Sequence, residues 1–278
     1  MTFRHSAAAV AIFAAAALAF SGATTRAASP QVLRVCADPD YMPFSNRAGE
    51  GFENVIAREV GRAMGRTVRF VWASTRTSGG FDQFLHETLN AGKCDAIMDV
   101  PYASTNVLAT RPYYVSSYVF VYPKKRNYDI SSLDSPVLRQ LRIGYEEDTP
   151  PETGLKLRTL ILHSVPFDIG DTEGQSPQMI LDALTAGQVS VVVTWEPSIG
   201  YYLRDRPDLK VVEVPNSRAL GAPEQYAFPM AMAARNGDKR TRDALDAVIG
   251  KDKAQLTRIL ERYGVRLYQP SSDVGMVR

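Results

Sequence analysis

The sequence predicts an α/β fold of the type in which two similar lobes are joined by a two-crossover hinge, with a cleft between them. Three observations lead to this fold class. A helix, a glycine and an apolar strand occur in succession around Gly92 and again around Gly187. This is one internal repeat. A second repeat relates the strand-like residues 33–40 to residues 141–148, and because the two repeats occur in the same order in both halves, they indicate two similar lobes. Two amphipathic helices near the C-terminus also exceed what the second lobe needs, so the chain should return to the first lobe.

Each of the two helix–glycine–strand segments also locates one edge of the cleft. The glycine lies just past the last helical turn, where a left-handed residue ends a helix without steric strain. The strand after it is nearly all apolar, which is typical of a parallel sheet covered by helices on both faces. Because ligands of open α/β sheets bind beyond the carboxyl ends of the strands, residues 99–102 and 194–197 should border the cleft.

Residues 1–27 have the pattern of a secretory signal peptide. A positively charged start precedes an alanine-rich apolar run at residues 7–20, and cleavage is expected after Ala23 or Ala27. The run is too short for a comfortable membrane span, and no later stretch approaches spanning length. We therefore expect an exported, periplasmic protein without a membrane span.

Removal of the signal peptide changes the charge balance of the chain. The full chain has 32 Lys and Arg against 30 Asp and Glu, and Arg4 and Arg26 leave with the signal. The mature chain then has a net charge near zero. Neither this balance nor export supports a nucleic-acid partner.

The first lobe is expected to contain residues 28–124 and 226–270, and the second lobe residues 125–225, with a flexible tail at 271–278. Residues 124–127 should form the first crossover. Apolar periodicity predicts strands at 32–37, 68–72, 95–100, 117–122, 189–194, 210–214 and 227–234, and helices at 52–64, 81–89, 153–162, 177–184, 240–249 and 252–263.

Two cysteines remain in the mature chain, and they lie on strands that the fold should make neighbours. Cys36 is in the first strand, and Cys94 is at the start of the strand that follows Gly92. In an oxidising compartment a disulfide between them is favoured, and two buried thiols are the alternative. Loop-closure entropy would make such a bridge worth up to about 4 kcal/mol.

Motifs for catalysis and for metal binding are missing from the sequence. None of the three histidines is paired with a cysteine or another ligand at metal spacing. There is no nucleophile elbow, phosphate loop or dinucleotide glycine motif. Acidic residues near strand ends could act as general acids or bases. The favoured interpretation is that they are solvated loop residues or that their charge stabilises the N-terminus of a helix. We therefore expect no catalytic residue, no bound metal and no enzyme activity.

Residues near the predicted strand ends are candidates for contact with a ligand or a protein partner. Aromatic side chains can stack on either, although any single one can instead fill the core. Trp195 stands out because it directly follows a strand. Its side chain could equally line the cleft or pack in the core. The candidates are Asp38, Tyr41, Asp99, Tyr102, Trp195, Glu196 and Tyr201.

The signal, the two lobes and the missing catalytic motifs resemble a type 2 periplasmic solute-binding protein, over essentially the whole mature chain. Amino-acid receptors of this group carry an Arg after the third strand that clamps the ligand carboxylate. Residues 102–109, the corresponding segment, contain no Arg, and Ser190 stands where the second lobe of these receptors has an acidic residue. The resemblance therefore does not imply an amino-acid ligand.

A narrower resemblance rests on several motifs that occur in one order. They are Leu33-Arg-Val-Cys-Ala-Asp-Pro39, Pro43-Phe-Ser-Asn46, Gly49-Glu-Gly-Phe-Glu-Asn54, Gly92-Lys-Cys-Asp95, Thr110-Arg-Pro-Tyr-Tyr114 and Tyr118-Val-Phe-Val121. These motifs resemble the solute-binding-like "J" proteins encoded with quinoprotein methanol dehydrogenases. The resemblance implies an accessory protein of an enzyme that uses pyrroloquinoline quinone (PQQ) and a calcium or lanthanide ion. The cofactors would belong to that enzyme, and none is expected on this chain.

Three functions are compatible with these features. The favoured one is a periplasmic accessory protein that binds the methanol dehydrogenase and assists its maturation or activation. The alternative is a receptor that holds a small non-amino-acid molecule in the cleft and delivers it to an ABC-type importer. A periplasmic enzyme on the same fold, such as a dehydratase, is disfavoured by the missing carboxylate clamp. Closure around a ligand would support the receptor, and co-purification with the dehydrogenase would support the accessory protein.

Overall fold

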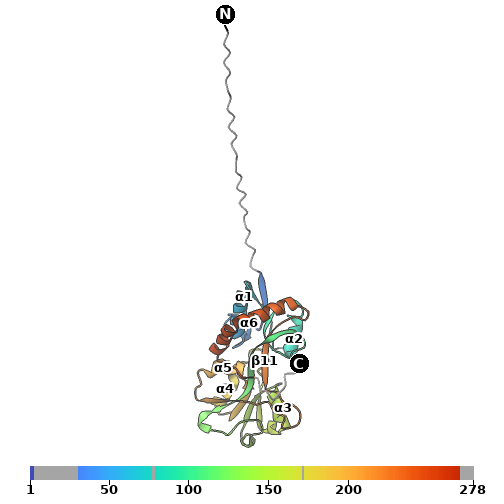
Figure 1. Ribbon diagram of the computed structural model, residues 1–278. Coiled ribbons are helices and arrows are strands. Elements are labelled where there is room, and N and C mark those ends of the chain that lie inside the picture. Colours follow the sequence, from blue (N-terminus) through green and yellow to red (C-terminus); the bar gives the residue numbers. More distant parts are fainter. Residues whose placement is uncertain (3–30, 77–78, 171, 270–278) are drawn as a thin grey trace.

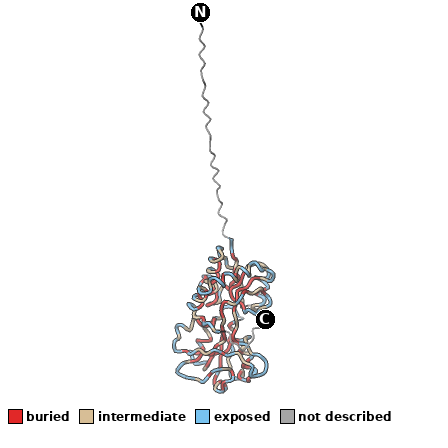
Figure 2. The backbone as a smooth tube through the Cα atoms, in the orientation of Figure 1, coloured by how far each residue is buried: buried red, intermediate tan, exposed pale blue. Residues whose placement is uncertain are grey.

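The structure is a computed structural model that describes residues 31–76, 79–170 and 172–269, together with the first two residues. The expected signal peptide, beyond residue 2, and the expected tail at 271–278 lie outside the described residues. Within the described part, no helix is long and apolar enough to cross a membrane. Two α/β lobes lie one above the other in Figure 1, and the buried backbone runs through the middle of both in Figure 2.

The sheet of the first lobe mixes parallel and antiparallel pairs. β1 and β4 pair in parallel, and a bridge between Val35 and Ala96 connects β1 to the chain just before β5. β11 pairs antiparallel with β5 on one side and with β6 on the other. These strands are β1 (Val32–Ala37), β4 (Thr67–Trp72), β5 (Ile97–Pro101), β11 (Ala227–Ala234) and the first half of β6 (Leu108–Pro123), and a small hairpin of β2 (Asp40–Tyr41) and β3 (Ser45–Asn46) follows β1.

Three helices cover this sheet: α1 (Phe52–Ala63), α2 (Gly80–Glu87) and α6 (Lys239–Arg262). α1 buries Phe52, Ile56 and Val60, whose spacing of four residues places them on one face. Leu245 and Leu260 of α6 pack into the same core, so the C-terminal helical segment lies on the first lobe. The two helices expected there follow one another within α6 and are separated by a kink at Asp252, whose backbone angles are non-helical.

The second lobe has the strand order β10-β6-β9-β7-β8, in which β7 pairs in parallel with both β8 and β9. Its helix α3 begins and ends earlier than the predicted 153–162. The elements are β7 (Ile143–Glu146), α3 (Pro150–Leu157), β8 (Ser164–Phe167), α4 (Gln178–Thr185), β9 (Val191–Trp195), α5 (Glu196–Leu203) and β10 (Leu209–Glu213), with short 3-10 turns η1 (Lys124–Arg126), η2 (Pro136–Gln140) and η3 (Leu160–His163).

β6 belongs to both sheets. Residues 108–117 pair with β11, whereas residues 119–123 pair with β10. The prediction that this strand starts at 117 and that residues 124–127 form the crossover was wrong, because the chain crosses between the lobes inside the strand. Pro112 interrupts the strand pattern in the sequence, but it lies at an irregularity of the pairing, where proline is tolerated.

The second crossover lies beside the first, and backbone hydrogen bonds join them. Tyr118 N–H donates to the carbonyl of Tyr226 at 2.9 Å, and Val214 N–H donates to the carbonyl of Tyr118 at 2.9 Å. The side-chain oxygen of Asn216 accepts hydrogen bonds from the N–H groups of Tyr226 and Ala227 at 2.6 and 3.0 Å. The hinge therefore consists of two adjacent extended segments with paired backbones.

A second contact joins the lobes away from the hinge. The backbones of Gly200 in α5 and Gly264 after α6 approach closely, and a Cβ on Gly200 would lie 2.5 Å from the carbonyl oxygen of Gly264. Gly264 has φ +77, which only glycine adopts without strain. The end of the first lobe's last helix can thus pack on the second lobe only because both positions lack a side chain.

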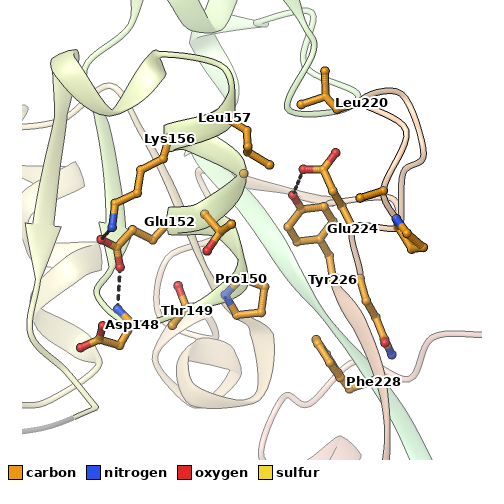
Figure 3. Close-up of a pocket in the computed structure, with 15 residues that line it drawn as sticks. Asp148, Thr149, Pro150, Glu152, Lys156, Leu157, Leu220, Glu224, Tyr226 and Phe228 are labelled. Atoms are coloured by element: carbon orange, nitrogen blue, oxygen red, sulfur yellow. Dashed lines mark hydrogen bonds and ion pairs between the residues drawn. The ribbon is translucent and has the colours of Figure 1, made fainter.

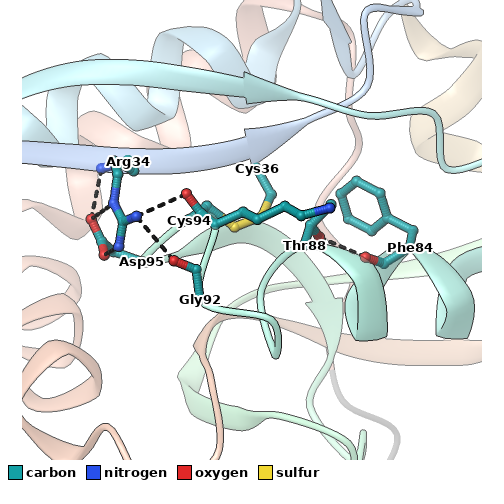
Figure 4. Close-up of a disulfide and its surroundings, with 8 residues drawn as sticks. Arg34, Cys36, Phe84, Thr88, Gly92, Cys94 and Asp95 are labelled. Atoms are coloured by element: carbon teal, nitrogen blue, oxygen red, sulfur yellow. Dashed lines mark hydrogen bonds and ion pairs between the residues drawn. A yellow bond between two sulfur atoms is a disulfide. The ribbon is translucent and has the colours of Figure 1, made fainter.

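The predicted disulfide between Cys36 and Cys94 is confirmed, and it joins β1 to the segment before β5 (Figure 4). The two Cα atoms are 5.6 Å apart. Beside it, the Arg34 guanidinium donates to both oxygens of Asp95 and to the carbonyls of Gly92 and Lys93. The same edge of the lobe is therefore fixed by a covalent link and by an ion pair.

We expect Gly200→Ala to lower the free energy of unfolding by about 1–3 kcal/mol, because the added methyl meets backbone that cannot rotate away. Urea unfolding measures this loss, and small-angle scattering reports any separation of the lobes. Gly170→Ala is the matched control, since a Cβ there meets open space. Equal unfolding curves for the two variants would contradict the tight contact.

We also expect that Cys94→Ser will lower the free energy of unfolding by up to about 4 kcal/mol, because the loop that the bridge closes is then free in the unfolded chain. The measurement is urea unfolding of the variant and of the oxidised parent. Thiol titration of denatured, unreduced parent protein should find no free thiol. Two free thiols per chain would refute the bridge.

Candidate functional site

A cavity of about 290 Å³ lies between the lobes at the carboxyl ends of β1 and β5. Most of its lining comes from the first lobe, and Trp195, at the end of β9, closes it from the second. The lining residues are Cys36, Ala37, Asp38, Tyr41, Phe44, Ser45, Glu53, Thr75, Phe81, Phe84, Ile97, Asp99, Pro101, Trp195 and Met230.

Four of the predicted site residues line this cavity, namely Asp38, Tyr41, Asp99 and Trp195. The side chain of Asp38 already accepts hydrogen bonds from groups of its own lobe. One of its oxygens accepts the N–H of Asp40 at 2.8 Å, and the other accepts the N–H and hydroxyl of Thr75 at 2.7 and 2.9 Å. Asp38 therefore holds the loops at the cavity wall in place.

Three predicted site residues lie elsewhere. Tyr102 is 42% exposed beyond the end of β5, where its N–H donates to the carbonyl of Pro229. Tyr201 packs against Tyr263, in the contact between α5 and the end of α6. Glu196 is fully buried in the same region and accepts the N–H of Arg266 at 3.0 Å. None of the three lines the cavity. Glu196 and Tyr201 lie outside it because α5 begins immediately after β9 and turns residues 196–203 away, and Tyr102 lies outside it because it follows the last residue of β5.

Glu146, at the end of β7, and Glu196 are both buried carboxyl groups outside the cavity lining. Burial raises the pKa of Glu146 to about 7, although hydrogen bonds from Thr194 and Ser198 oppose the shift. Burial likewise raises the pKa of Glu196 to about 8. Each therefore exists partly or mostly as the neutral acid at neutral pH.

Arg76 is a cleft residue that the sequence analysis missed. It is 2% exposed, and its guanidinium lies 4.6 Å from the ring centre of Tyr41. It donates to the carbonyl of Asp40 in the first lobe and to the carbonyls of Thr172 and Gln175 in the second. Arg76 thus joins the two lobes across the cleft. It follows β4, so the strand-end rule that selected the other candidates would have found it if applied to that strand.

Asp99 and Glu53 form the acidic part of the cavity. Asp99 is 8% exposed, its Oδ2 accepts the hydroxyl of Tyr114 at 2.8 Å, and its Oδ1 has no hydrogen-bond partner among the described residues. Burial raises the pKa of Asp99 to about 7. Burial and the negative charge of Asp99 raise the pKa of Glu53 well above its usual range. Glu53 was not predicted, because it lies in the first helical turn, where an acidic residue is commonplace.

A larger groove of about 720 Å³ lies outside the cleft, between α3 and the second crossover (Figure 3). Tyr226 and Phe228 line one side, and Pro150 and Leu157 of α3 line the other. Leu157 is 58% exposed and Leu220, on the crossover, is 48% exposed. The groove therefore presents apolar surface on both of its walls.

Comparisons with known proteins agree with this architecture. Residues 33–266 match the bacterial extracellular solute-binding proteins, family 3. The chain is 29% identical over 250 residues to protein MoxJ of Methylorubrum extorquens, covering 84% of this chain and 80% of MoxJ. It is 26% identical to protein MoxJ of Paracoccus denitrificans, covering 93% and 96% of the two chains.

Solved structures show the same fold. The periplasmic binding protein XoxJ from Methylobacterium extorquens AM1 is 28% identical, with a TM-score of 0.68 over 85% of this chain and 99% of XoxJ. MxaJ from Methlophaga aminisulfidivorans, at 24% identity, has a TM-score of 0.73 over 85% and 100% of the two chains. These findings confirm the type 2 fold and the resemblance to the J proteins. The chain belongs to the bacterial extracellular solute-binding proteins, family 3.

Proposed function

We propose that this protein is a periplasmic accessory protein of methanol oxidation that binds the methanol dehydrogenase and assists its maturation or activation. The similarity to MoxJ and XoxJ supports the link to methanol oxidation, since the sequence motifs resemble proteins encoded with that enzyme. PQQ and the calcium or lanthanide ion are assigned to the dehydrogenase. In this proposal the chain itself has no catalytic residue and reaches the periplasm through its signal peptide.

The observation that carries the docking proposal is the groove between α3 and the second crossover. Leu157 and Leu220 expose apolar side chains on opposite walls, and Figure 3 shows both at the edge of the groove. Paired apolar side chains around a concave surface are typical of protein interaction sites. We assign this groove to a protruding segment of the dehydrogenase.

The wall of the groove is connected to the hinge. Both oxygens of Glu224 accept hydrogen bonds from Arg158, at 2.7 and 2.8 Å, and the Tyr226 hydroxyl donates to Glu224 at 2.7 Å. The carbonyl of Tyr226 accepts the N–H of Tyr118 at the crossing point. A partner that fits the groove in only one arrangement of the lobes would shift the hinge equilibrium by its differential affinity.

Leu157→Asp and Leu220→Asp should each weaken binding to the purified dehydrogenase at least tenfold, because a charge would be buried against the partner. The measurement is the dissociation constant by biolayer interferometry, with circular dichroism to check the fold. Leu162→Asp is the matched control, since Leu162 is 73% exposed and lies outside the groove lining. It should retain the parent affinity.

Two results would contradict the proposal. One is unchanged affinity in both groove variants. The other is the absence of any complex at micromolar concentrations, together with fully active dehydrogenase in a deletion strain. The second result would favour the importer receptor, in which the cleft and not the groove is the binding surface.

A further inference from the structure

The cavity between the lobes has a feature that docking at the groove does not use. Oδ1 of Asp99 is buried in the cavity wall with no donor near it among the described residues. A buried acceptor without a partner is unfavourable, because it has lost its hydrogen bonds to water. The side chain itself is fixed, since its other oxygen accepts the hydroxyl of Tyr114. The cavity thus contains an acceptor that is held in place and lacks a donor.

We infer that this cavity binds a small protonated alkylamine, whose ammonium group pairs with Asp99 and Glu53 and whose alkyl chain lies on the aromatic wall. Among the described residues, the lining contains three carboxyl groups and no Lys, Arg or His. Asp38 is occupied by Thr75 and Asp40, so Asp99 and Glu53 remain for the ligand. Two carboxylates in one low-dielectric space repel each other, and a cation between them relieves that repulsion.

The residues that line the cavity restrict which kind of cation can bind there. A metal ion is disfavoured, because the described residues contain no group of three His, Cys, Asp or Glu that could hold one. An ammonium group with at least one N–H satisfies the free oxygen of Asp99, which a quaternary ammonium cannot do. Trp195 can stabilise the cation through its ring face, and Phe81, Phe84, Ile97 and Met230 provide an apolar surface for an alkyl chain.

A free amino acid would fit less well than the corresponding amine. Its carboxylate would need a positive partner, and Arg76 is the nearby cation. The guanidinium of Arg76 already donates to the carbonyls of Asp40, Thr172 and Gln175. Binding an amino-acid carboxylate would therefore break the link between the lobes, whereas an alkylamine leaves it intact.

Affinity should depend on pH with a definite sign. Because burial raises the pKa of Asp99 to about 7, lowering the pH below 7 neutralises the carboxyl group and removes its attraction for a cation. Affinity should thus fall by about tenfold between pH 8 and pH 6. The titratable groups that interact with Asp99 are Glu53 on α1 and Tyr113 and Tyr114 on β6. Asp38 lines the same cavity and faces the guanidinium of Arg76 at 3.7 Å.

Isothermal titration calorimetry with three matched ligands tests the inference on the isolated mature protein. Butylammonium should bind at pH 8 and bind about tenfold more weakly at pH 6. 1-Butanol, which lacks the charge, and norvaline, which adds a carboxylate, should each bind at least tenfold more weakly than butylammonium. No heat from butylammonium at millimolar concentrations, or equal binding of butanol or norvaline, would overturn it.

Two substitutions assign the site. Asp99→Asn keeps an acceptor for the hydroxyl of Tyr114, and Glu53→Gln changes a side chain that is only half-buried. We therefore expect both variants to fold. Each should weaken butylammonium binding at least tenfold at pH 8, while the exposed control Glu261→Gln should leave it unchanged. Parent-like affinity in folded samples of both variants would refute the site. These titrations contain no dehydrogenase, so their outcome is separate from that of the docking proposal.

Discussion

The rest of the structure depends on one continuous strand, β6, whose backbone hydrogen bonds belong to two sheets. Because each half of a strand must pair its N–H and C=O groups, the first half fixes β11 and the second half fixes β9 and β10. The lobes therefore cannot separate without bending β6 and the crossover beside it. The chain leaves one sheet and enters the next at Ser117 and Tyr118, and this region is the expected place for a hinge.

The cavity and the groove lie on either side of this crossing point, and aromatic side chains connect them. Trp195 lines the cavity, Phe228 lines the groove, and their ring centres are 6.0 Å apart. Tyr118 contacts both rings, at 5.1 Å from Trp195 and 6.4 Å from Phe228. An occupant of the cavity and a partner in the groove would thus act on the same packed cluster at the hinge, which gives a physical route for coupling between them.

The charged groups of this cleft differ from those of a cleft in which an Arg binds the carboxylate of the ligand. The guanidinium of Arg76 lies 3.7 Å from Asp38 and donates to backbone carbonyls of both lobes, so it stabilises the contact between the lobes. The carboxyl groups of Asp99 and Glu53 lie in the cavity, where burial raises the pKa of both. A cavity of this kind favours cations or protons over anions.

The sequence by itself predicted the two lobes from ordered repeats and the return of the C-terminal helices from apolar periodicity. It also favoured the Cys36–Cys94 disulfide over two buried thiols, because the expected compartment is oxidising and the two strands were expected to be neighbours. It also placed Asp38, Tyr41, Asp99 and Trp195 near the cavity, since strand ends can be located from strand patterns. Only the tertiary structure decided that β6 crosses the hinge as one strand, that α5 carries Glu196 and Tyr201 away, and that Arg76 and Glu53 reach the cleft. The reason is that strand pairing, helix direction and side-chain contacts across lobes are set by residues far apart in the chain, and no local pattern records them.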